Sequence, residues 1–268
     1  MNAPIGIFDS GIGGLTVANA ISGVLPNEQL IYFGDTAHLP YGDKSKELIK
    51  HYSERITDYL VKEKGCKAIV IACNTASSAA YEYLRDKYRG VVPIISVIDP
   101  IIEAIVEDDS IHRVGLIATK ATIASGVYQE KLQRRKPDIS YAPLATPLLV
   151  PMIEEGFHNN NISHALIHNY LENEALRNID ALVLGCTHYI IVRKEIDAFY
   201  GGKVKLFDST SIVANKLRKI LQKEGLLSLE RKKNDEFLVS DYTEAFAKTA
   251  RMFYGHEIKL VLKDIWKD

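Results

Sequence analysis

Short apolar segments alternate with longer amphipathic segments along almost the whole chain, and this alternation constrains the fold more than any other feature. Several short segments are continuous apolar runs, as in strands that helices cover on both faces. Strand, helix, strand in sequence predicts parallel βαβ units. The predicted strands are residues 4–9, 30–33, 68–72, 94–98, 114–118, 139–144, 181–184 and 204–207, with weaker candidates at 237–239 and 258–262.

The longer segments carry apolar side chains at helical spacing. In residues 45–64 one stripe holds the apolar positions 48, 49, 52, 56, 59 and 60, and Gly65 follows as the helix stop. Residues 75–88 carry positions 76, 79, 80, 83 and 84 in the same way. The predicted class is therefore α/β, with mostly parallel sheets in three layers.

The chain also repeats itself. Residues 6–10 are loosely similar to residues 115–119, which lie 109 positions later. Residues 69–75 are more closely similar to residues 182–188. This second similarity aligns Cys73 with Cys186 at the same point after a strand. We therefore expect two related α/β halves with the active site in the cleft between them.

The best boundary between these halves is near Asp99-Pro100, because proline restricts the preceding residue and is expected to end the strand there. A return near Asp208 would let the C-terminal segment rejoin the first half. The predicted domains are residues 1–98 plus 209–268, and residues 99–208.

Composition excludes several classes of function. The 33 Lys and Arg nearly balance the 34 Asp and Glu, so no large basic field is present to hold nucleic acid. Apolar residues at 47% and charged residues at 25% are typical of a globular protein. No run approaches the roughly 18 apolar residues of a membrane span.

The N-terminal residues 1–4 do not begin a signal peptide, and three cysteines do not suit a disulfide scaffold. These features favour a cytoplasmic protein. No C-x₂-C or spaced histidine pair is present, so the sequence does not favour a metal site.

Two of the cysteines stand where a strand meets a helix. Cys73 directly precedes Asn74-Thr75, which are good helix N-caps, and a helix N-terminus is expected to lower the pKa of a thiol. Cys186 has the same placement, with His188 close enough to be a proton partner. The alternative is that both are inert buried side chains. Cys66 has no counterpart, and we interpret it as structural.

The glycine-rich loop at residues 9–14 (DSGIGG) begins at the end of the first strand. Such a loop is typical of nucleotide-binding sites, but its sequence does not match their motifs. Thr16 stands where G-x-G-x-x-G needs its last glycine, and no G-K-[ST] follows. The remaining prediction is a turn whose exposed amides could bind a carboxylate. Asp9 is either a turn residue or a polar group aimed into the cleft.

Other polar groups follow later strands. Residues 40–42, Pro-Tyr-Gly, offer amides and a phenol, and Thr119 and Thr122 follow the strand at 114–118. Glu154 is either a solvated helix charge or a member of the site. Because ligands bind at the carboxyl ends of strands in open α/β sheets, we expect these loops to form one rim in each half.

Two rims facing each other would place Cys73 and Cys186 on opposite sides of one cleft. Two acid/base groups on either side of a carbon can remove a proton from one face and return one to the other, which inverts a stereocentre. Sulfur suits this task because a thiol's pKa can be tuned around neutrality.

Four motifs together resemble those of bacterial glutamate racemases, in matching order from the first strand to about Asp208. They are residues 9–17 (DSGIGGLTV), 40–42 (PYG), 72–75 (ACNT) and 185–189 (GCTHY). Two departures, His38-Leu39 and Ile190-Ile191, lie outside the motif residues.

The resemblance implies a cofactor-independent interconversion of L- and D-glutamate that supplies D-glutamate for peptidoglycan, with no metal and no cofactor. It implies that Cys73 acts on the D-enantiomer and Cys186 on the L-enantiomer, and that Asp9, Glu154 and His188 assist them. The implied substrate-binding residues are Asp9, Ser10, Tyr41, Gly42, Asn74, Thr75, Thr187 and His188, with Thr119 and Thr122 as further candidates. The oligomeric state stays open, a homodimer included.

Three alternatives remain at this point. The first is racemisation of another acidic amino acid such as aspartate. The second is dependence on pyridoxal phosphate, which the absence of lysine from the motif loops does not favour. The third is a two-lobed module that binds an amino acid and needs the cleft but not the thiols.

Overall fold

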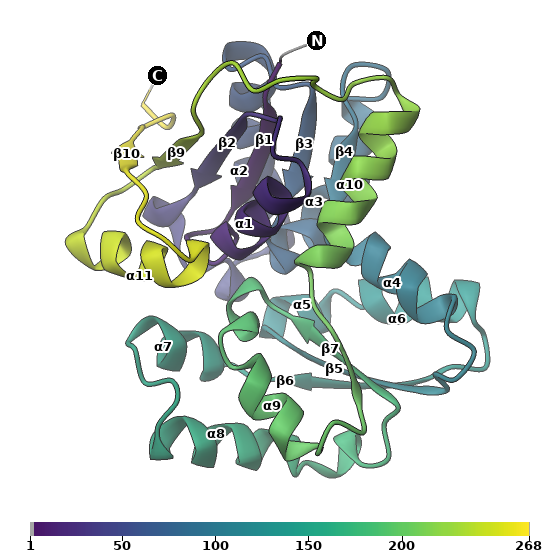
Figure 1. Cartoon of the computed structure of the whole chain (residues 1–268). Coiled ribbons are helices and arrows are strands. Elements are labelled where there is room, and N and C mark those ends of the chain that lie inside the picture. The colour runs from purple at the N-terminus through teal and green to yellow at the C-terminus, as the bar shows by residue number, and fades with distance from the viewer. Residues whose placement is uncertain (1–2, 268) are drawn as a thin grey trace.

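Two α/β halves, one above the other, make up the computed structural model, which describes residues 3–267 (Figure 1). The first half holds a six-stranded sheet in the order β10-β9-β2-β1-β3-β4, and the second a four-stranded sheet in the order β6-β5-β7-β8. Neighbouring strands pair in parallel in both sheets. The predicted class, α/β with parallel sheets, is confirmed.

Each predicted strand is present, with ends that differ by one or two residues. The first sheet contains β1 (Ile5–Asp9), β2 (Leu30–Gly34), β3 (Ala68–Ile71), β4 (Ile94–Ser96), β9 (Glu236–Val239) and β10 (Leu260–Leu262). The second contains β5 (Arg113–Ala118), β6 (Ser140–Ala145), β7 (Ala181–Gly185) and β8 (Lys205–Phe207).

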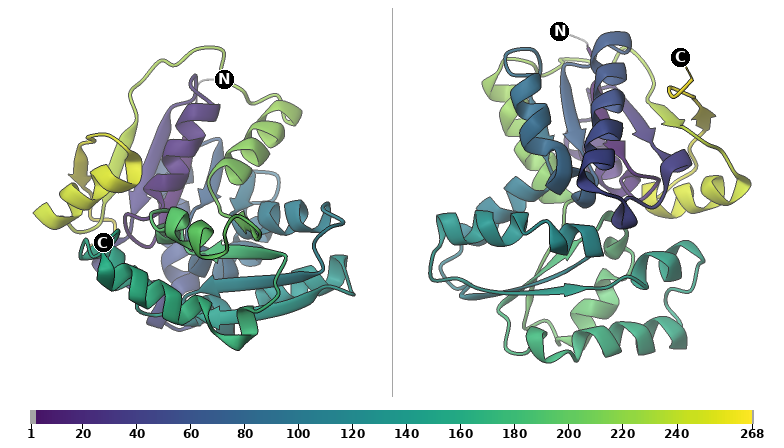
Figure 2. Two further views of the ribbon diagram at one scale, coloured as in Figure 1. Left: turned by 60° about the horizontal axis from the view of Figure 1, so that its bottom comes forward. Right: turned by 180° about the vertical axis from the view of Figure 1, so that it is seen from behind.

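Helices cover both faces of each sheet (Figures 1 and 2). In the first half they are α1 (Leu15–Val24), α2 (Lys46–Asp58), α3 (Asn74–Lys87), α10 (Ser211–Lys223) and α11 (Glu244–Tyr254). Beside the second sheet lie α4 (Ile98–Val106), α5 (Lys120–Ala124), α6 (Val127–Arg135), α7 (Leu149–Glu154), α8 (Asn161–Leu171) and α9 (Arg193–Phe199). Among the helices of the described residues, none is long and apolar enough to cross a membrane.

The helix predicted over residues 45–64 begins as expected, because the Ser45 hydroxyl accepts a hydrogen bond from the Leu48 amide at 3.3 Å. It continues from α2 into a π-helical turn at Tyr59–Glu63. Gly65, at φ +63°, then adopts the left-handed conformation that favours glycine after a helix.

The internal repeat appears as a shared topology. The order β2-β1-β3-β4 in the first sheet matches β6-β5-β7-β8 in the second. Gly6 pairs with Ile69 in the first half, and Gly115 pairs with Leu182 in the second. A Cβ on Gly6 would lie 2.7 Å from Ile69 Cδ1, and one on Gly115 would lie 3.0 Å from Leu182 Cδ1. The two halves therefore repeat the same close approach of neighbouring strands.

The strand predicted to end at Asp99-Pro100 ends earlier, at Ser96, and this prediction was wrong. Asp99 and Pro100 lie in the first turn of α4. The Ser96 hydroxyl accepts hydrogen bonds from the amides of Ile98, at 3.1 Å, and Asp99, at 3.2 Å. Proline fits here because a residue in the first helical turn needs no intrahelical N–H.

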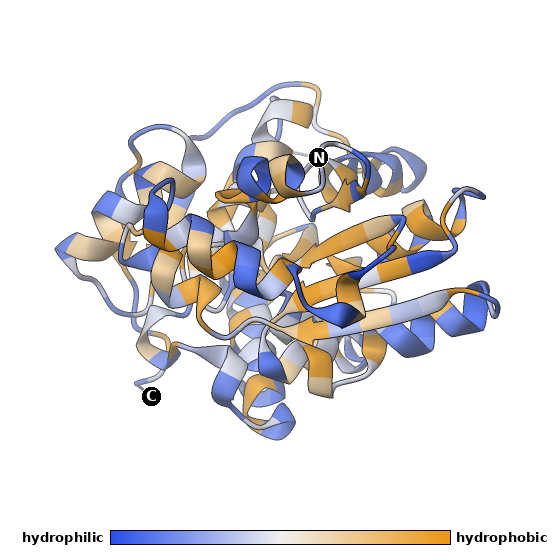
Figure 3. Cartoon of the chain, turned by 90° about the horizontal axis from the view of Figure 1, so that it is seen from below, coloured by the Kyte–Doolittle hydropathy of each residue, from blue (hydrophilic) through white to orange (hydrophobic). Residues whose placement is uncertain are grey.

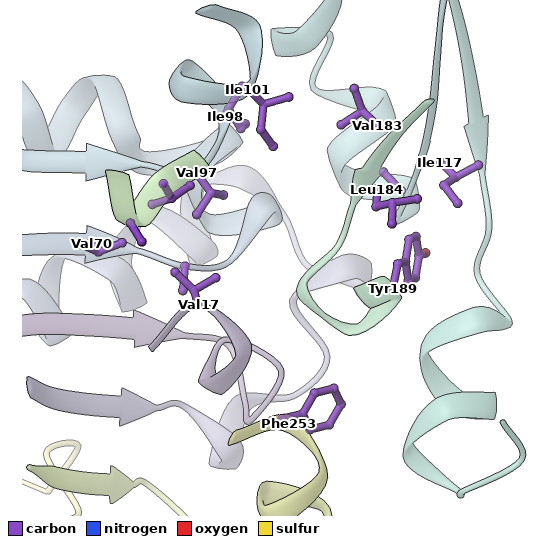
Figure 4. Packing of buried hydrophobic residues seen from close by; sticks show 14 of the residues in the cluster. Val17, Val70, Val97, Ile98, Ile101, Ile117, Val183, Leu184, Tyr189 and Phe253 are labelled. Atoms are coloured by element: carbon purple, nitrogen blue, oxygen red, sulfur yellow. The ribbon is translucent and has the colours of Figure 1, made fainter. Parts of the chain in front are cut away.

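One apolar core extends across both halves (Figure 4). The strands are mostly hydrophobic, whereas hydrophilic residues are concentrated on the outer helices and loops (Figure 3). Val17 and Val70 contribute from the first half and Val183, Leu184 and Tyr189 from the second. Because this core is shared, the two halves are packed against each other beneath the site that lies between them.

Candidate active site

A cavity of about 270 Å³ lies between the halves. Its walls include residues that directly follow strands of both sheets: Ser10 after β1, Thr119 after β5, Thr146 after β6 and Cys186 after β7. Cys73 also lines it, two residues beyond the end of β3. The site therefore lies at the carboxyl ends of parallel strands, where open α/β sheets bind ligands.

Cys73 forms the N-cap of α3. Its sulfur accepts a hydrogen bond from the Ala76 amide at 3.4 Å, and its thiol faces the Ser10 hydroxyl at 3.6 Å. The sequence predicted Asn74 or Thr75 as the cap, but the cysteine takes that position itself, with extended backbone at φ −74° and ψ 126°.

Burial raises the pKa of Cys73 to about 12, and the nearby negative charge of Asp9 adds to this effect. The Ala76 amide and the Ser10 hydroxyl act in the opposite direction but do not offset it. The prediction that the helix N-terminus lowers the pKa of this thiol was therefore wrong. A thiolate here loses its hydration, and one amide at 3.4 Å does not replace it.

Cys186 is the first member of a chain of three polar side chains. Its sulfur lies 3.6 Å from His188 Nδ1, and His188 Nε2 lies 2.9 Å from Glu154 Oε1. Burial opposes a positive charge on His188, but the charge of Cys186 and the hydrogen bonds to Cys186 and Glu154 outweigh it and raise the pKa of His188 to about 10. A charged imidazole can donate to both neighbours at once.

Asp9 ends β1 and is fully buried behind the wall of the cavity. Its Oδ2 accepts hydrogen bonds from the amides of Gly11, at 3.2 Å, and Gly14, at 3.0 Å. The glycine loop therefore binds a carboxylate, as its sequence predicts, but the carboxylate belongs to the chain. Burial raises the pKa of Asp9, although His188 and the loop amides lower it.

Of the ten residues implied as substrate-binding, eight line the cavity. The other two, Asp9 and Thr122, are buried behind its wall. The Thr75 hydroxyl lies 3.0 Å from the Thr119 hydroxyl and 3.2 Å from that of Thr122, so these three threonines join the halves. The eight that line the cavity are Ser10, Tyr41, Gly42, Asn74, Thr75, Thr119, Thr187 and His188.

Sequence reasoning missed several residues around the site. The Asp35 carboxylate accepts hydrogen bonds from the Tyr41 hydroxyl at 2.7 Å and the Ser240 hydroxyl at 2.8 Å, so it holds the phenol of the Pro-Tyr-Gly loop. Thr146 lines the cavity and lies 2.7 Å from the Tyr189 hydroxyl. Both Asp35 and Thr146 directly follow strands, so the rule that selected Ser10 and Thr119 would have found them.

The cavity also contains Lys120, next to Thr119, although sequence reasoning placed no lysine at the motif loops. This lysine is exposed. Over residues 3–267, no group of three or more His, Cys, Asp and Glu side chains could hold a metal ion.

Comparison with known proteins points to one family. Residues 16–217 match the model of the Asp/Glu/Hydantoin racemase family. The glutamate racemase of Chlorobaculum tepidum is 40% identical over 258 residues, which cover 96% of this chain and 94% of that protein. The glutamate racemase of Thermus thermophilus is 41% identical over 259 residues, which cover 97% of this chain and 95% of that protein.

A solved structure agrees closely with the fold. The crystal structure of glutamate racemase from Francisella tularensis, in complex with D-glutamate, superimposes with a TM-score of 0.92. It is 36% identical, with 99% of this chain and 98% of that chain covered. The resemblance that four motifs carry is thus confirmed over the full length. The chain belongs to the Asp/Glu/Hydantoin racemase family.

Proposed function

We propose that this chain interconverts L- and D-glutamate without a cofactor and supplies D-glutamate for peptidoglycan synthesis. One observation carries the proposal: Cys73 and Cys186 occupy equivalent positions in two matching halves and line the same cavity. An inert role for the thiols would not require this symmetry.

In the proposed reaction one cysteine, as thiolate, takes the proton from Cα of glutamate. The electron pair of the C–H bond moves into the α-carboxylate, and the other cysteine, as thiol, returns a proton to the opposite face of the same carbon. Cys73 acts on D-glutamate and Cys186 on L-glutamate. Because the pKa of Cys73 is raised to about 12, Cys73 is a thiol at neutral pH and can donate its proton to Cα.

Neighbouring groups assist each sulfur. Asp9 and Ser10 lie on the Cys73 side, where the Ser10 hydroxyl faces the thiol at 3.6 Å. His188 and Glu154 lie on the Cys186 side, where His188 Nδ1 lies 3.6 Å from the sulfur. Each sulfur thus has its own partners. This suits the proposed reaction, in which each cysteine is the base in one direction and the acid in the other.

The substrate-binding groups are backbone amides and neutral side chains for the most part. With a net charge of −1, the chain has no global field to attract an anionic substrate, so local donors must bind the carboxylates. We assign this task to Ser10, Tyr41, Gly42, Asn74, Thr75, Thr187 and His188, with Thr119 beside them and Asp9 and Thr122 in support. The D-glutamate complex of the 36% identical relative supports the choice of substrate.

Deuterium wash-in tests the proposal. Extensively dialysed enzyme is incubated with L- or D-glutamate in heavy water. We expect deuterium to replace the Cα hydrogen and both enantiomers to form. A two-lobed binding module would bind glutamate without exchange, and that result would overturn the proposal.

The choice between glutamate and aspartate rests on kcat/KM for the two acids. A site fitted to the longer side chain is expected to reject aspartate strongly, because buried polar groups would be left unpaired. Comparable kcat/KM values would instead favour a racemase for acidic amino acids in general. Loss of activity on dialysis, with rescue by pyridoxal phosphate, would favour the cofactor-dependent alternative.

We further infer that residues 1–98 plus 209–268 form one domain and residues 99–208 the other. Two features support this division: β9 pairs with β2 in the first sheet, and α10 packs against α1. Light scattering of the purified chain decides between a monomer and a homodimer.

A further inference from the structure

One buried hydrogen bond crosses between the two halves directly beside Cys73. The Tyr128 hydroxyl, from α6, donates to Asn74 Oδ1 at 2.7 Å. Tyr128 is 1% exposed and Asn74 is 2% exposed, so water does not compete for this bond. Asn74 lines the cavity, whereas Tyr128 lies behind its wall.

The amide of Asn74 has a second polar end. Oδ1 is occupied by Tyr128, while Nδ2 is buried and has no hydrogen-bond partner in the protein. A buried donor without a partner lowers stability, so such groups are rare unless a ligand completes them. Because Asn74 lines the cavity, a molecule that binds there could supply this partner.

We infer that Tyr128 is a positioning residue: by holding Asn74 Oδ1, it presents Asn74 Nδ2 as a donor to a carboxylate oxygen of the substrate. The inference rests on the proposed function for the identity of that substrate. An amide can turn over about its last bond, and an oxygen facing the carboxylate would repel it. The Tyr128 hydroxyl stabilises the productive orientation.

The two residues belong to different halves, and this has a consequence for recognition. Asn74 begins α3 beside the six-stranded sheet, and Tyr128 lies on α6 beside the four-stranded sheet. The donor is therefore oriented only while the halves are in contact. Substrate recognition by the first half thus depends on a residue of the second.

Tyr128→Phe removes the hydroxyl and keeps the ring, so packing is largely preserved. We expect the KM for glutamate to rise about tenfold, the size of effect of one charge-assisted hydrogen bond, with kcat changed less than about threefold. The matched control is Tyr88→Phe, which removes the hydroxyl that donates to Asp58, away from the cavity. An unchanged KM in Tyr128→Phe, or an equal rise in Tyr88→Phe, would overturn the inference.

A double-mutant comparison separates positioning from a general structural effect. If Tyr128 acts through Asn74, adding Tyr128→Phe to Asn74→Ala should change kcat/KM less than about twofold. The same tenfold loss in both backgrounds would mean that Tyr128 acts by another route.

Asn74→Asp, which can still accept from Tyr128 but lacks Nδ2, is expected to raise KM at least as much as Asn74→Ala. If the Asn74→Asp variant has the same KM for glutamate as the wild type, the inference is wrong.

Binding in the absence of turnover distinguishes this inference from the proposed function. In the Cys73→Ala background, calorimetry measures the affinity for D-glutamate whether or not the chain racemises it. We expect Tyr128→Phe to weaken that affinity about tenfold. Unchanged affinity overturns the positioning role, whereas failed deuterium wash-in by the wild type overturns the proposed function alone.

Discussion

Glu154 Oε1 lies 2.9 Å from His188 Nε2, on the side of the ring opposite Cys186. The Glu154 side chain is 34% exposed and that of His188 is 7% exposed, so the pair leads from the buried sulfur toward the mouth of the cavity. In the proposed reaction, a proton that Cys186 takes from substrate could therefore pass to solvent through this pair. The same contact also helps to keep His188 charged at neutral pH.

Glu154→Gln is expected to lower the pKa of His188, because it removes a negative charge and the hydrogen bond that favours the charged ring. In the wild type this pKa is about 10. The stability that charged His188 contributes is full below about pH 6.5, the value in the unfolded chain, and is lost as pH rises toward 10. In the variant the loss begins at lower pH.

NMR titration of the His188 ring in both proteins measures this shift directly. Glu195→Gln, which neutralises a carboxylate of the second half outside the cavity, is the control. Equal His188 pKa values in Glu154→Gln and wild type would show that Cys186 alone keeps the ring charged.

Cys73→Ala and Cys186→Ala are each expected to reduce racemisation by at least about a thousandfold, because in the proposed mechanism each removes the acid or base on one face of Cα. Cys66→Ala is the matched control. Cys66 is also buried with a pKa raised to about 12, but it does not line the cavity. Circular dichroism follows the conversion of each enantiomer, and thermal melting verifies folding. If Cys66→Ala lost activity as completely as the others, the thiol pair would have no special role.

Sequence patterns predicted the ten strands, because each strand depends on residues that are neighbours along the chain. They also predicted that Cys73 and Cys186 face one cavity, because both cysteines follow strands at matching points of the repeat. Apolar runs mark buried strands, and residues after those strands fall on one rim. Tyr128 escaped this reasoning, since its partner Asn74 is 54 residues away and in the other half. Contacts of this kind exist only after the halves have packed.

The pKa of Cys73 could not be predicted for a related physical reason. Its place at a helix N-terminus is visible in the sequence and favours the thiolate. Its burial and the nearby charge of Asp9 depend on tertiary structure, and they act more strongly in the opposite direction. The predicted strand end at Asp99-Pro100 was wrong for another reason, because proline suits a first helical turn as well as the end of a strand.

Gly13→Ala is expected to lower kcat/KM at least about tenfold. A Cβ on Gly13 would lie 2.5 Å from the imidazole of His188 and from the Thr187 hydroxyl, so both side chains would have to move. His188 is tied to Glu154 at 2.9 Å, and its displacement would break the chain from Cys186 to solvent.

Gly23→Ala is the matched control for this substitution. Gly23 lies in α1, and a Cβ there would meet nothing within 4 Å. Alanine in a helix is favoured over glycine by about 0.5–1 kcal/mol, so we expect this variant to melt at a higher temperature with unchanged kcat/KM. Full activity in Gly13→Ala would show that the His188 ring tolerates the displacement.

Lys67→Met is expected to destabilise the fold by about 3–5 kcal/mol, because it leaves a carboxylate buried without its cation. Lys67 Nζ lies 2.6 Å from Glu28 Oε2, and the two side chains are 4% and 1% exposed. The ammonium also donates to the Leu226 carbonyl at 2.6 Å, which ties the segment after α10 to the first sheet. Urea denaturation measures the loss. The double variant Glu28→Gln, Lys67→Met should recover part of it, and equal losses in both would show that the Leu226 contact, not the buried charge, dominates.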